Sequence, residues 1–335
     1  MRVSLFDDPK IKGQLLPFTF TRPVAAIRIG IMTIADKWKQ FGFEIGYSTE
    51  AYLNKKFPSI DATLRINGGL IPDAEIVETI KSLAYGEALY ANDMQLASLG
   101  QEKTKRAYSG DVTLIEHSYD IFRLNRDQIE SDYALLTKGR VSQSITDPHT
   151  VVYGKENLFI EEGASITAAI INAENGPVYI GKNAVVHEGA IIKGAFALGE
   201  SSHVNMGAKI KGDTTIGPHC KVGGEVSNSV IFGYSNKGHD GFLGNSVIGE
   251  WCNLGADTNT SNLKNNYASV KLWSYGASRF ANTGLQFCGL MMGDHSKCGI
   301  NTMFNTGTVV GVGANIFGSG FPRNFIPSFS WGGAN

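Results

Sequence analysis

Residues 180–222 read IGKNAV-VHEGAI-IKGAFA-LGESSH-VNMGAK-IKGDTT-IGPHCK-V, and an aliphatic residue opens every group of six. A small or slender side chain follows four residues later in most groups, from Ala184 to Val226. Neither a helix nor an ordinary strand repeats with this period. A six-residue unit that points one aliphatic and one small residue inward describes one flat side of a prism, so three units complete a coil of about 18 residues. The stretch predicts a parallel β-helix.

The period is interrupted twice further along the chain. After Val222 the register slips by two residues and returns with Phe242, Ile248 and Leu254, and it slips again before a run that starts at Met292. Each slip predicts chain that loops out of the prism, near residues 227–241 and near residues 259–287. Long loops inside compact domains usually have a function, and solenoid proteins often carry their sites at such interruptions. A surface insertion without a function is the alternative.

Composition and charge suit a repeat protein with two domains. Glycine makes up 40 of the 335 residues, charged residues make up 18 %, and the formal net charge is -1. The charge disfavours a nucleic-acid or membrane partner that binds through bulk electrostatics. The first ten residues carry charges in place of a secretory apolar core, and the apolar stretch 23–35 is too short to cross a bilayer. A cytoplasmic protein is expected.

Cysteine and histidine spacing disfavours metal sites and disulfides. The four cysteines show no C-x-x-C spacing, and at least three fall on inward positions, so we expect core packing for Cys220, Cys252, Cys288 and Cys298. Three histidines, His187, His203 and His219, are each 16 residues apart, two short of a coil. They are therefore expected not to stack on one edge of the prism, and no metal site is predicted.

His239 lies in the first predicted interruption, directly before the hexads resume. A loop histidine at the mouth of a rigid prism, with Asn253 nearby and Asn262 at the start of the second loop, suits a general base beside amide groups. An exposed loop histidine without a function is the alternative. The position of His239 in the sequence favours neither the general base nor the histidine without a function.

The run from Lys237 to Asn262, KGHDGFLGNSVIGEWCNLGADTNTSN, resembles the acetyltransferase signature of the bifunctional enzymes that make UDP-N-acetylglucosamine. Those enzymes join a glucosamine-1-phosphate N-acetyltransferase, built as a left-handed parallel β-helix of hexapeptide repeats, to an N-acetylglucosamine-1-phosphate uridyltransferase domain. The similarity covers most of residues 156–325. The opening segments 5–9 and 15–24 and the final segment 325–333 resemble a divergent bacterial branch of this family.

The resemblance implies an activity and a set of site residues. His239 matches the catalytic base, Asn253 matches a residue that contacts the sugar, and Ala256 and Asn262 match residues that line the acetyl-CoA groove. Acetyl-CoA is then the cosubstrate and an amino sugar phosphate, glucosamine 1-phosphate, the acceptor. The rivals are a noncatalytic trimeric scaffold or regulator and an acyltransferase for another, nucleotide-linked amino sugar.

Three departures concern recognition of the acceptor phosphate. Phe242 replaces a tyrosine of the family, and Asn205 and Ser227 stand where an arginine and a lysine are expected. Phosphate binding needs positive charge and hydrogen-bond donors more than one particular residue. We therefore expect Lys237 and Lys264 to contribute to substrate binding.

The first 150 residues predict a mixed α/β domain, since strand and helix patterns alternate there. Strands are expected at residues 3–6 and 63–66, and helices at residues 24–40, 73–83 and 120–138. The family resemblance implies a shortened sugar nucleotidyltransferase-like domain at 1–141, a linker at 142–155 and the β-helix at 156–335.

The usual glycine-rich phosphate loop is missing after the first strand of this domain. Asp8 and Arg22 could form a shortened nucleotide site for UTP, with Mg²⁺ bridging phosphates to the carboxylate. Alternatively, the domain has lost catalysis and serves packing, assembly or regulation, because a phosphate cradle depends on glycine for close backbone approach.

Assembly follows from the flat sides of the prism. A flat side cannot enclose a cosubstrate, so a homotrimer that shares sites between neighbouring β-helices is expected from the family. The loop 259–287 would reach an adjacent subunit through Trp273, Tyr275 and Phe280, because apolar residues in a polar loop often make contacts. Folding back onto its own subunit is the alternative.

Overall fold

The computed structural model describes residues 1–332, which form two compact units. Residues 1–27 and 32–117 make the first unit, and residues 28–31 and 118 onward make the second. Segment 118–141 thus groups with the β-helix, although the sequence assigns it to the first domain. Residues 333–335 lie outside the described part of the chain, and Gly333 of the expected final segment is one of them.

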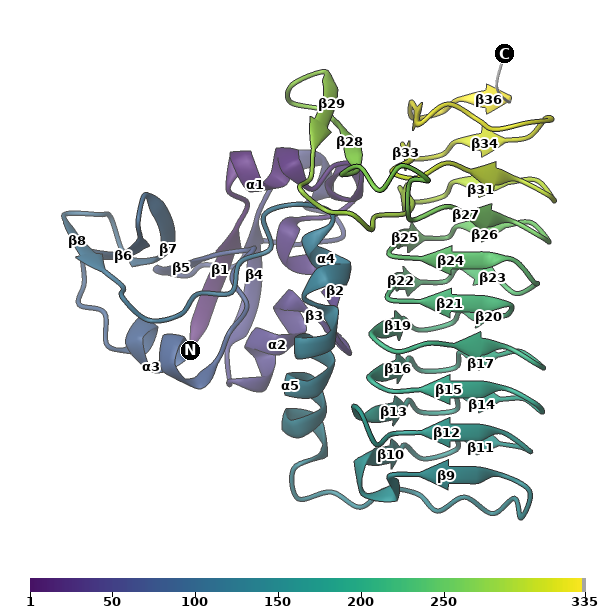
Figure 1. Cartoon of the computed structure of the whole chain (residues 1–335). Helices are drawn as coiled ribbons and strands as arrows, with labels where there is room; N and C mark the ends of the chain where they lie inside the picture. The colour runs from purple at the N-terminus through teal and green to yellow at the C-terminus, as the bar shows by residue number, and fades with distance from the viewer. Residues whose placement is uncertain (333–335) are drawn as a thin grey trace. The chain divides into compact units, whose positions relative to one another are not determined.

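The first unit is built on a mixed sheet (Figure 1). Strands β4, β1 and β5 run parallel, β7 is antiparallel to β5 and to β6, and β8 is parallel to β6. In sheet order the strands are β4 (Glu44–Ser48), β1 (Arg2–Phe6), β5 (Leu64–Asn67), β7 (Met94–Leu99), β6 (Glu87–Ala91) and β8 (Thr104–Ala107). Its α-helices are α1 (Pro9–Gln14), α2 (Ile34–Gln40) and α3 (Ala74–Lys81).

The two expected strands and the expected helix at 73–83 are confirmed as β1, β5 and α3. The single helix expected at 24–40 is wrong, since only its second half is α-helical. A short 3-10 turn at Val24–Ala26 is followed by β2 (Arg28–Ile29), Gly30 at φ +70°, and β3 (Met32–Thr33). Helix α2 begins after Thr33, whose hydroxyl accepts the backbone N–H of Asp36. This N-cap explains where the helix starts.

The second unit contains the parallel β-helix predicted from the hexads, and this left-handed solenoid is stacked from β9 to β36 (Figure 1). Within the described residues, its first face contains β10 (Leu158–Ile160), β13 (Val178–Ile180), β16 (Phe196–Leu198), β19 (Thr214–Ile216), β22 (Val230–Gly233), β25 (Val247–Glu250), β30 (Met291–Met292), β33 (Val309–Val310) and β35 (Phe325–Ile326).

The second face contains β11 (Ser165–Ile166), β14 (Val185–Val186), β17 (His203–Val204), β20 (Lys221–Val222), β23 (Asn236–Lys237), β26 (Asn253–Leu254), β31 (Lys297–Cys298), β34 (Asn315–Ile316) and β36 (Trp331–Gly332). The third face contains β9 (Val151–Tyr153), β12 (Ile170–Asn172), β15 (Ile191–Lys193), β18 (Lys209–Ile210), β21 (Glu225–Ser227) and β24 (Phe242–Gly244), with the pair β27 (Asn259–Thr260) and β32 (Met303–Phe304) further along. The expected linker thus already contains the first strand, β9.

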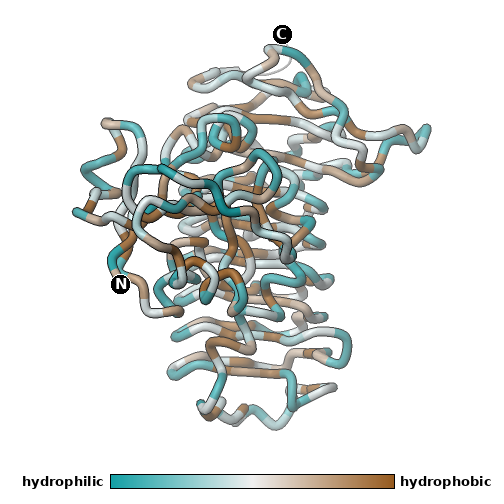
Figure 2. Tube along the Cα trace, turned by 90° about the vertical axis from the view of Figure 1, so that its left-hand side faces the viewer, coloured by the Kyte–Doolittle hydropathy of each residue, from teal (hydrophilic) through white to brown (hydrophobic). Residues whose placement is uncertain are grey.

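The hexad positions form the core of the solenoid. Both the aliphatic and the small positions from Ile180 to Val226 are buried, and hydrophobic residues recur along the coils (Figure 2). The four cysteines are buried and free, as expected for core packing. Burial of these side chains supplies the main stabilisation of stacked coils that cannot fold alone.

The first slip of the register has a different cause from the one expected. Residues 227–241 do not loop out, because they contain β22 and β23 and stay in the solenoid. The turn between β20 and β21 is two residues long, Gly223 and Gly224, whereas the turns before and after it at the same corner are four residues long, 205–208 and 238–241. The inward position after the slip is Leu243, which is fully buried, and the expected Phe242 is only half-buried.

The second slip does correspond to an excursion. After β27 the chain leaves the prism and forms an antiparallel hairpin of β28 (Lys271–Ser274) and β29 (Arg279–Asn282), then returns at β30. The ring of Trp273 stacks on Phe325 at 4.2 Å, and Tyr275 meets Phe325 edge-on. Two of the three expected anchors therefore pack on the last coils of their own chain.

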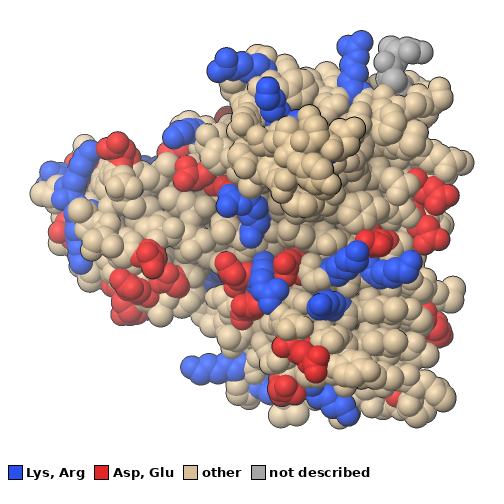
Figure 3. Space-filling model, viewed as in Figure 1, with Lys and Arg blue, Asp and Glu red and all other residues tan. Residues whose placement is uncertain are grey.

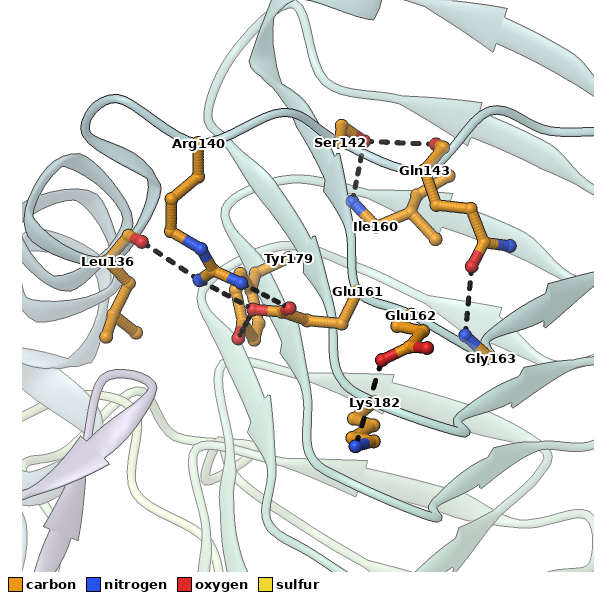
Figure 4. A network of polar contacts seen from close by, with 10 residues as sticks. All are labelled: Leu136, Arg140, Ser142, Gln143, Ile160, Glu161, Glu162, Gly163, Tyr179 and Lys182. Atoms are coloured by element: carbon orange, nitrogen blue, oxygen red, sulfur yellow. Dashed lines mark hydrogen bonds and ion pairs between the residues drawn. The ribbon is translucent and has the colours of Figure 1, made fainter.

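The expected helix at 120–138 is confirmed as α4 (Asp120–Arg123) and α5 (Asn125–Thr137), and α5 lies against β16 and β19 of the first face. Just after α5, Arg140 binds Glu161 with two parallel hydrogen bonds, and the hydroxyl of Tyr179 donates to the same carboxylate (Figure 4). This cluster ties the end of the helix to the first coils.

Candidate active site

The short turn Gly223–Gly224 leaves a notch at the corner between the second and third faces. A hollow of about 440 Å³ occupies this notch, and we call it the His239 hollow. The turns of three consecutive coils and His187 of the preceding coil line it. Its residues are His187, Asn205, Met206, Gly223, Gly224, Gly238, His239 and Asp240.

Glycine is required at the floor of the His239 hollow. A Cβ on Gly223 would lie 2.4 Å from the carbonyl oxygen of Gly238, and a Cβ on Gly224 would lie 2.7 Å from that of Gly241. Gly224 also has φ +71°, a conformation that other residues rarely adopt. The two glycines therefore let the short turn pass close beneath the turn that carries His239.

The side chain of His239 is exposed at the rim of this hollow. Two side chains hold the backbone of its turn: Asn205 Nδ2 donates to the carbonyl of Gly238 at 2.8 Å, and Lys237 Nζ donates to the carbonyl of His239 at 2.8 Å. An accessible imidazole on a fixed turn can accept a proton from a group bound in the hollow. The geometry therefore suits the expected general base.

Lys237 is buried inside the solenoid, whereas a residue that binds substrate should be accessible. It occupies an inward position of the solenoid and is 2 % exposed, with Nζ bonded to the carbonyl oxygens of Gly223 and His239. Burial lowers the pKa of this ammonium to about 8, while Asp240 and Asp257 oppose the shift. Because its donors point at backbone oxygens inside the coil, Lys237 does not face the hollow as the sequence suggested.

Two histidines expected to lie apart are in contact. His187 Nε2 and His203 Nδ1 are 3.2 Å apart, and the rings lie 5.5 Å apart. The register pairs Val185 with His203, and His187 is the first residue after β14, so its ring reaches back over the next strand. Burial lowers the pKa of His203, and nearby His187 and Lys221 lower it further. The pair of imidazole rings thus stands beside the His239 hollow, which His187 helps to line.

The other expected site residues are spread over the same region. Asn253 is half-buried on the second face, and its Oδ1 accepts from Asn236 Nδ2 at 3.1 Å. Ala256 lies in the turn after β26, next to the turn of His239 at the same corner. Asn262 Nδ2 donates to Asn245 Oδ1 at 2.7 Å where the excursion begins. None of the three lines the His239 hollow.

A second hollow, of about 580 Å³, lies between the β28–β29 hairpin and the last coils, and we call it the hairpin hollow. Three cations and three aromatic rings surround it, and its full lining is Lys264, Lys271, Trp273, Phe280, Thr306, Arg323, Asn324 and Phe325. Lys264 Nζ also donates to the carbonyl of Ser269. The sequence indicated Lys264 as a substrate contact and Trp273 and Phe280 as contacts to a neighbouring subunit. It did not indicate residues 323–325, because no repeat relates the hairpin to them.

In the first unit, a hollow of about 640 Å³ is lined by Asp8, Lys10, Ala91, Asn92, Asp93, Met94, Val112, Leu114 and Glu116. Asp8 accepts the backbone N–H groups of Lys10 and Ile11 and so caps α1. Arg22 is 2 % exposed and does not line this hollow. Asp8 therefore lines this hollow and Arg22 does not.

Within the described residues, no group of three or more His, Cys, Asp or Glu side chains could hold a metal ion. No helix in the described part of the chain is both long and apolar enough to cross a membrane.

Comparisons with known proteins match different parts of the chain to different proteins. Residues 3–141 match the family model described as sugar nucleotidyl transferase. The chain therefore joins a sugar nucleotidyl transferase domain to a left-handed parallel β-helix. The chain is similar to a divergent GlmU-like family, in agreement with the resemblance drawn from residues 237–262.

Several curated relatives carry the name bifunctional protein GlmU, including the following two. The protein from Trichodesmium erythraeum is 33 % identical over 86 residues, 25 % of this chain and 18 % of the relative. The protein from Wigglesworthia glossinidia brevipalpis is 26 % identical over 269 residues, 73 % of this chain and 51 % of the relative. The chain thus spans about half or less of these relatives' lengths. A solved Arabidopsis UDP-N-acetylglucosamine acyltransferase aligns with 57 % of this chain and 66 % of its own at 18 % identity, with a TM-score of 0.23 that is too low to carry an argument.

Proposed function

We propose that this protein is an acetyl-CoA-dependent N-acetyltransferase that acts on an amino sugar phosphate, with His239 as the general base. The observation that carries the proposal is the exposed imidazole of His239, fixed at the rim of a hollow that a shortened turn opens in a rigid solenoid. The GlmU-like relationship supports the same chemistry.

The reaction assigned to this site is an acyl transfer to nitrogen. An ammonium group has no lone pair to attack with, so the base must remove a proton from the acceptor nitrogen. The imidazole of His239 accepts that proton, and the nitrogen attacks the thioester carbonyl. As the C–S bond breaks and the amide forms, the nitrogen loses a second proton, which the departing thiolate takes up to give the free thiol of CoA. Such a positioned base typically accelerates a reaction by about 10²–10⁴-fold.

The acceptor phosphate needs cations that the lining of the His239 hollow does not supply. The neighbouring third face carries the exposed lysines Lys193 on β15 and Lys209 on β18, and the exposed Lys211 directly follows β18. Lys and Arg side chains gather midway along this part of the molecule in Figure 3. Lys211 pairs with Glu225 at 2.6 Å. Lys209 directly follows the turn that lines the hollow, and its backbone N–H donates to Gly224. These positions support a phosphorylated acceptor such as glucosamine 1-phosphate.

The hairpin hollow supports acetyl-CoA as the donor. Lys264, Lys271 and Arg323 offer positive charge to phosphates, and the aromatic rings of Trp273 and Phe280 offer apolar surface to a base. Ala256 and Asn262 would then line the path of the cosubstrate toward His239. A homotrimer in the cytoplasm completes the proposal.

For the first unit we propose a structural or regulatory role. Asp7 accepts the backbone N–H of Val24 and the hydroxyl of Thr49, and Asp8 caps α1, so both carboxylates already have partners in the fold. The test is to add UTP with Mg²⁺ and N-acetylglucosamine 1-phosphate and to measure pyrophosphate. Release of pyrophosphate would reject this role and support a uridyltransferase.

The acetyl transfer is tested by incubating the purified protein with acetyl-CoA and a panel of amino sugars with and without a 1-phosphate, and by following free thiol. We expect His239→Ala to reduce transfer at least about 100-fold with an unchanged melting temperature. His149→Ala, at an exposed histidine outside both hollows, is the matched control. Wild-type protein that transfers no acetyl group would favour the noncatalytic scaffold instead.

A further inference from the structure

Lys237 stands in a column of apolar residues. On the inward side of the second face, Val204 pairs with Val222 and Val222 pairs with Lys237, and Leu254 and Cys298 continue the column in the coils beyond. The lysine is 2 % exposed, like its apolar neighbours. A charged group taken out of water is destabilising unless hydrogen bonds compensate it. An apolar side chain of similar length would fill this position at lower cost.

The partners of the ammonium connect it to the His239 hollow. Lys237 Nζ donates to the carbonyl oxygen of Gly223 at 3.1 Å and to that of His239 at 2.8 Å. Gly223 belongs to the short turn, and His239 belongs to the next turn at the same corner. The lysine therefore links from inside the two turns between which the hollow opens. The His239 hollow itself exists because the short turn has two residues fewer than its neighbours at this corner.

A lysine elsewhere on the same face gives a useful contrast. Lys297 Nζ also donates to the carbonyl of a histidine two residues away, His295, at 3.3 Å. That side chain is exposed and lines neither the His239 hollow nor the hairpin hollow. Because water can replace its bond, its loss should change little. The buried position of Lys237 is what makes its bond to the turn hard to replace.

We propose that Lys237 is a positioning residue, which holds the turn of His239 from inside the solenoid and does not contact the substrate. This inference rests on the proposed function of His239 as the base. A positioning role predicts an effect on the chemical step, whereas a substrate ligand would act on acceptor binding. The two roles are therefore separable by kinetics.

The test compares Lys237→Met with Lys297→Met in the full chain. Methionine keeps the length and apolar character of the lysine stem but donates no hydrogen bond. For Lys237→Met we expect kcat to fall about 10-fold or more with the KM for the acceptor unchanged. Hydrogen–deuterium exchange of the backbone amides in residues 238–242 should become faster. Lys297→Met should change neither kcat nor the exchange at residues 238–242. Lys237→Gln keeps an N–H donor on a shorter stem. Its kcat and its exchange rate at residues 238–242 should therefore lie between those of wild type and those of Lys237→Met.

The exchange measurement separates this inference from the proposed function. Faster exchange at 238–242 in Lys237→Met, with no acetyl transfer by wild type, would reject the proposed function and keep the positioning role. Unchanged exchange and unchanged kcat in a folded Lys237→Met would overturn the positioning role. A raised KM with unchanged kcat would overturn it as well, because it would assign Lys237 to the substrate.

Discussion

The amide nitrogen of Asn205 donates to the carbonyl oxygen of Gly238 at 2.8 Å, although the two residues belong to coils that are not adjacent. The coil between them carries the two-residue turn Gly223–Gly224 at this corner. A normal four-residue turn there would fill the space that the Asn205 side chain crosses. The bond thus joins the two walls of the His239 hollow across the gap that forms it.

Asn205→Ala should weaken both the turn and the activity. Loss of one hydrogen bond that leaves a carbonyl without its partner costs about 1 kcal/mol, so the free energy of unfolding should fall by about that amount. The turn of His239 would keep the side-chain bond from Lys237 and the backbone bond from Glu225 to Gly241, and kcat should fall more than the KM changes. Urea unfolding and steady-state kinetics measure the two effects. Asn172→Ala, whose side chain contacts Glu174 on an earlier coil, is the matched control. Wild-type kcat in Asn205→Ala would show that the bond has no part in placing His239.

Hexad counting located most of the core but not the cause of the hollow. A slip of the register reports how many residues have been gained or lost between two points, and not which turn gained or lost them. Residues 227–241 therefore looked like an inserted loop, whereas the chain is in fact shortened at Gly223–Gly224. The Gly-Gly pair itself was the available signal. Two consecutive glycines allow a tight turn with close backbone approach.

The same limit explains the misplaced side chains. With the slip assigned to a loop, Lys237 lay outside the prism and looked available for a phosphate, whereas the true count puts it on an inward position. His187 and His203 differ by less than a full coil, but one lies in a turn and the other begins a strand, so they meet at the corner. Contacts between different positions of neighbouring coils depend on turn geometry, which the period does not specify.

Lys237 should make stability depend on pH in the alkaline range. Burial lowers the pKa of Lys237 in the folded chain to about 8, below its ordinary value of 10.5. Between these values the unfolded chain holds a proton that the folded chain has released, so the free energy of unfolding rises with pH, by at most about 1.4 kcal/mol per pH unit. Lys237→Met lacks this dependence. The difference in unfolding free energy between wild type and Lys237→Met, measured from pH 7 to pH 10, should therefore shift in favour of wild type. A difference that stays constant would mean that burial does not disfavour the charged lysine.

The Arg140–Glu161 pair should contribute stability that is lost in acid. Partial burial alone raises the pKa of the Glu161 carboxyl, but the hydrogen bonds from Arg140 and Tyr179 outweigh burial and hold this pKa below its usual value. A carboxyl with a lowered pKa contributes stability above its unfolded value of 4.5 and loses it as pH falls through the folded value. Glu161→Gln should cost about 1 kcal/mol at pH 7, and the difference from wild type should shrink below pH 4.5. Glu162→Gln is the control, since Glu162 is exposed and its carboxylate lies 3.9 Å from Lys182 Nζ. Equal losses in the two variants would contradict the account.

An aromatic column at another corner of the solenoid balances ring stacking against backbone strain. The rings of His219, Tyr234, Trp251 and His295 stack in that order at 5.0, 4.5 and 6.3 Å, and all four residues have positive φ between 53° and 61°. Bulky residues adopt this left-handed conformation at a cost of about 1–2 kcal/mol, whereas asparagine adopts it readily. Replacing Trp251 by alanine removes the stacking and keeps the strain, while replacing it by asparagine removes both.

Trp251→Ala should therefore destabilise the protein by about 2 kcal/mol, since each aromatic pair contributes about 0.5–1.5 kcal/mol beyond its buried area. Trp251→Asn should be less destabilised than Trp251→Ala by about 1 kcal/mol, which is the relief of left-handed strain. Ser201, at the same corner with φ +55° and no stacked ring, isolates the strain, so Ser201→Asn should be stabilising by several tenths of a kcal/mol. Chemical unfolding of the three variants measures these differences. If Trp251→Ala and Trp251→Asn lose the same free energy while Ser201→Asn is neutral, the left-handed turns are not strained, and stacking alone explains the column.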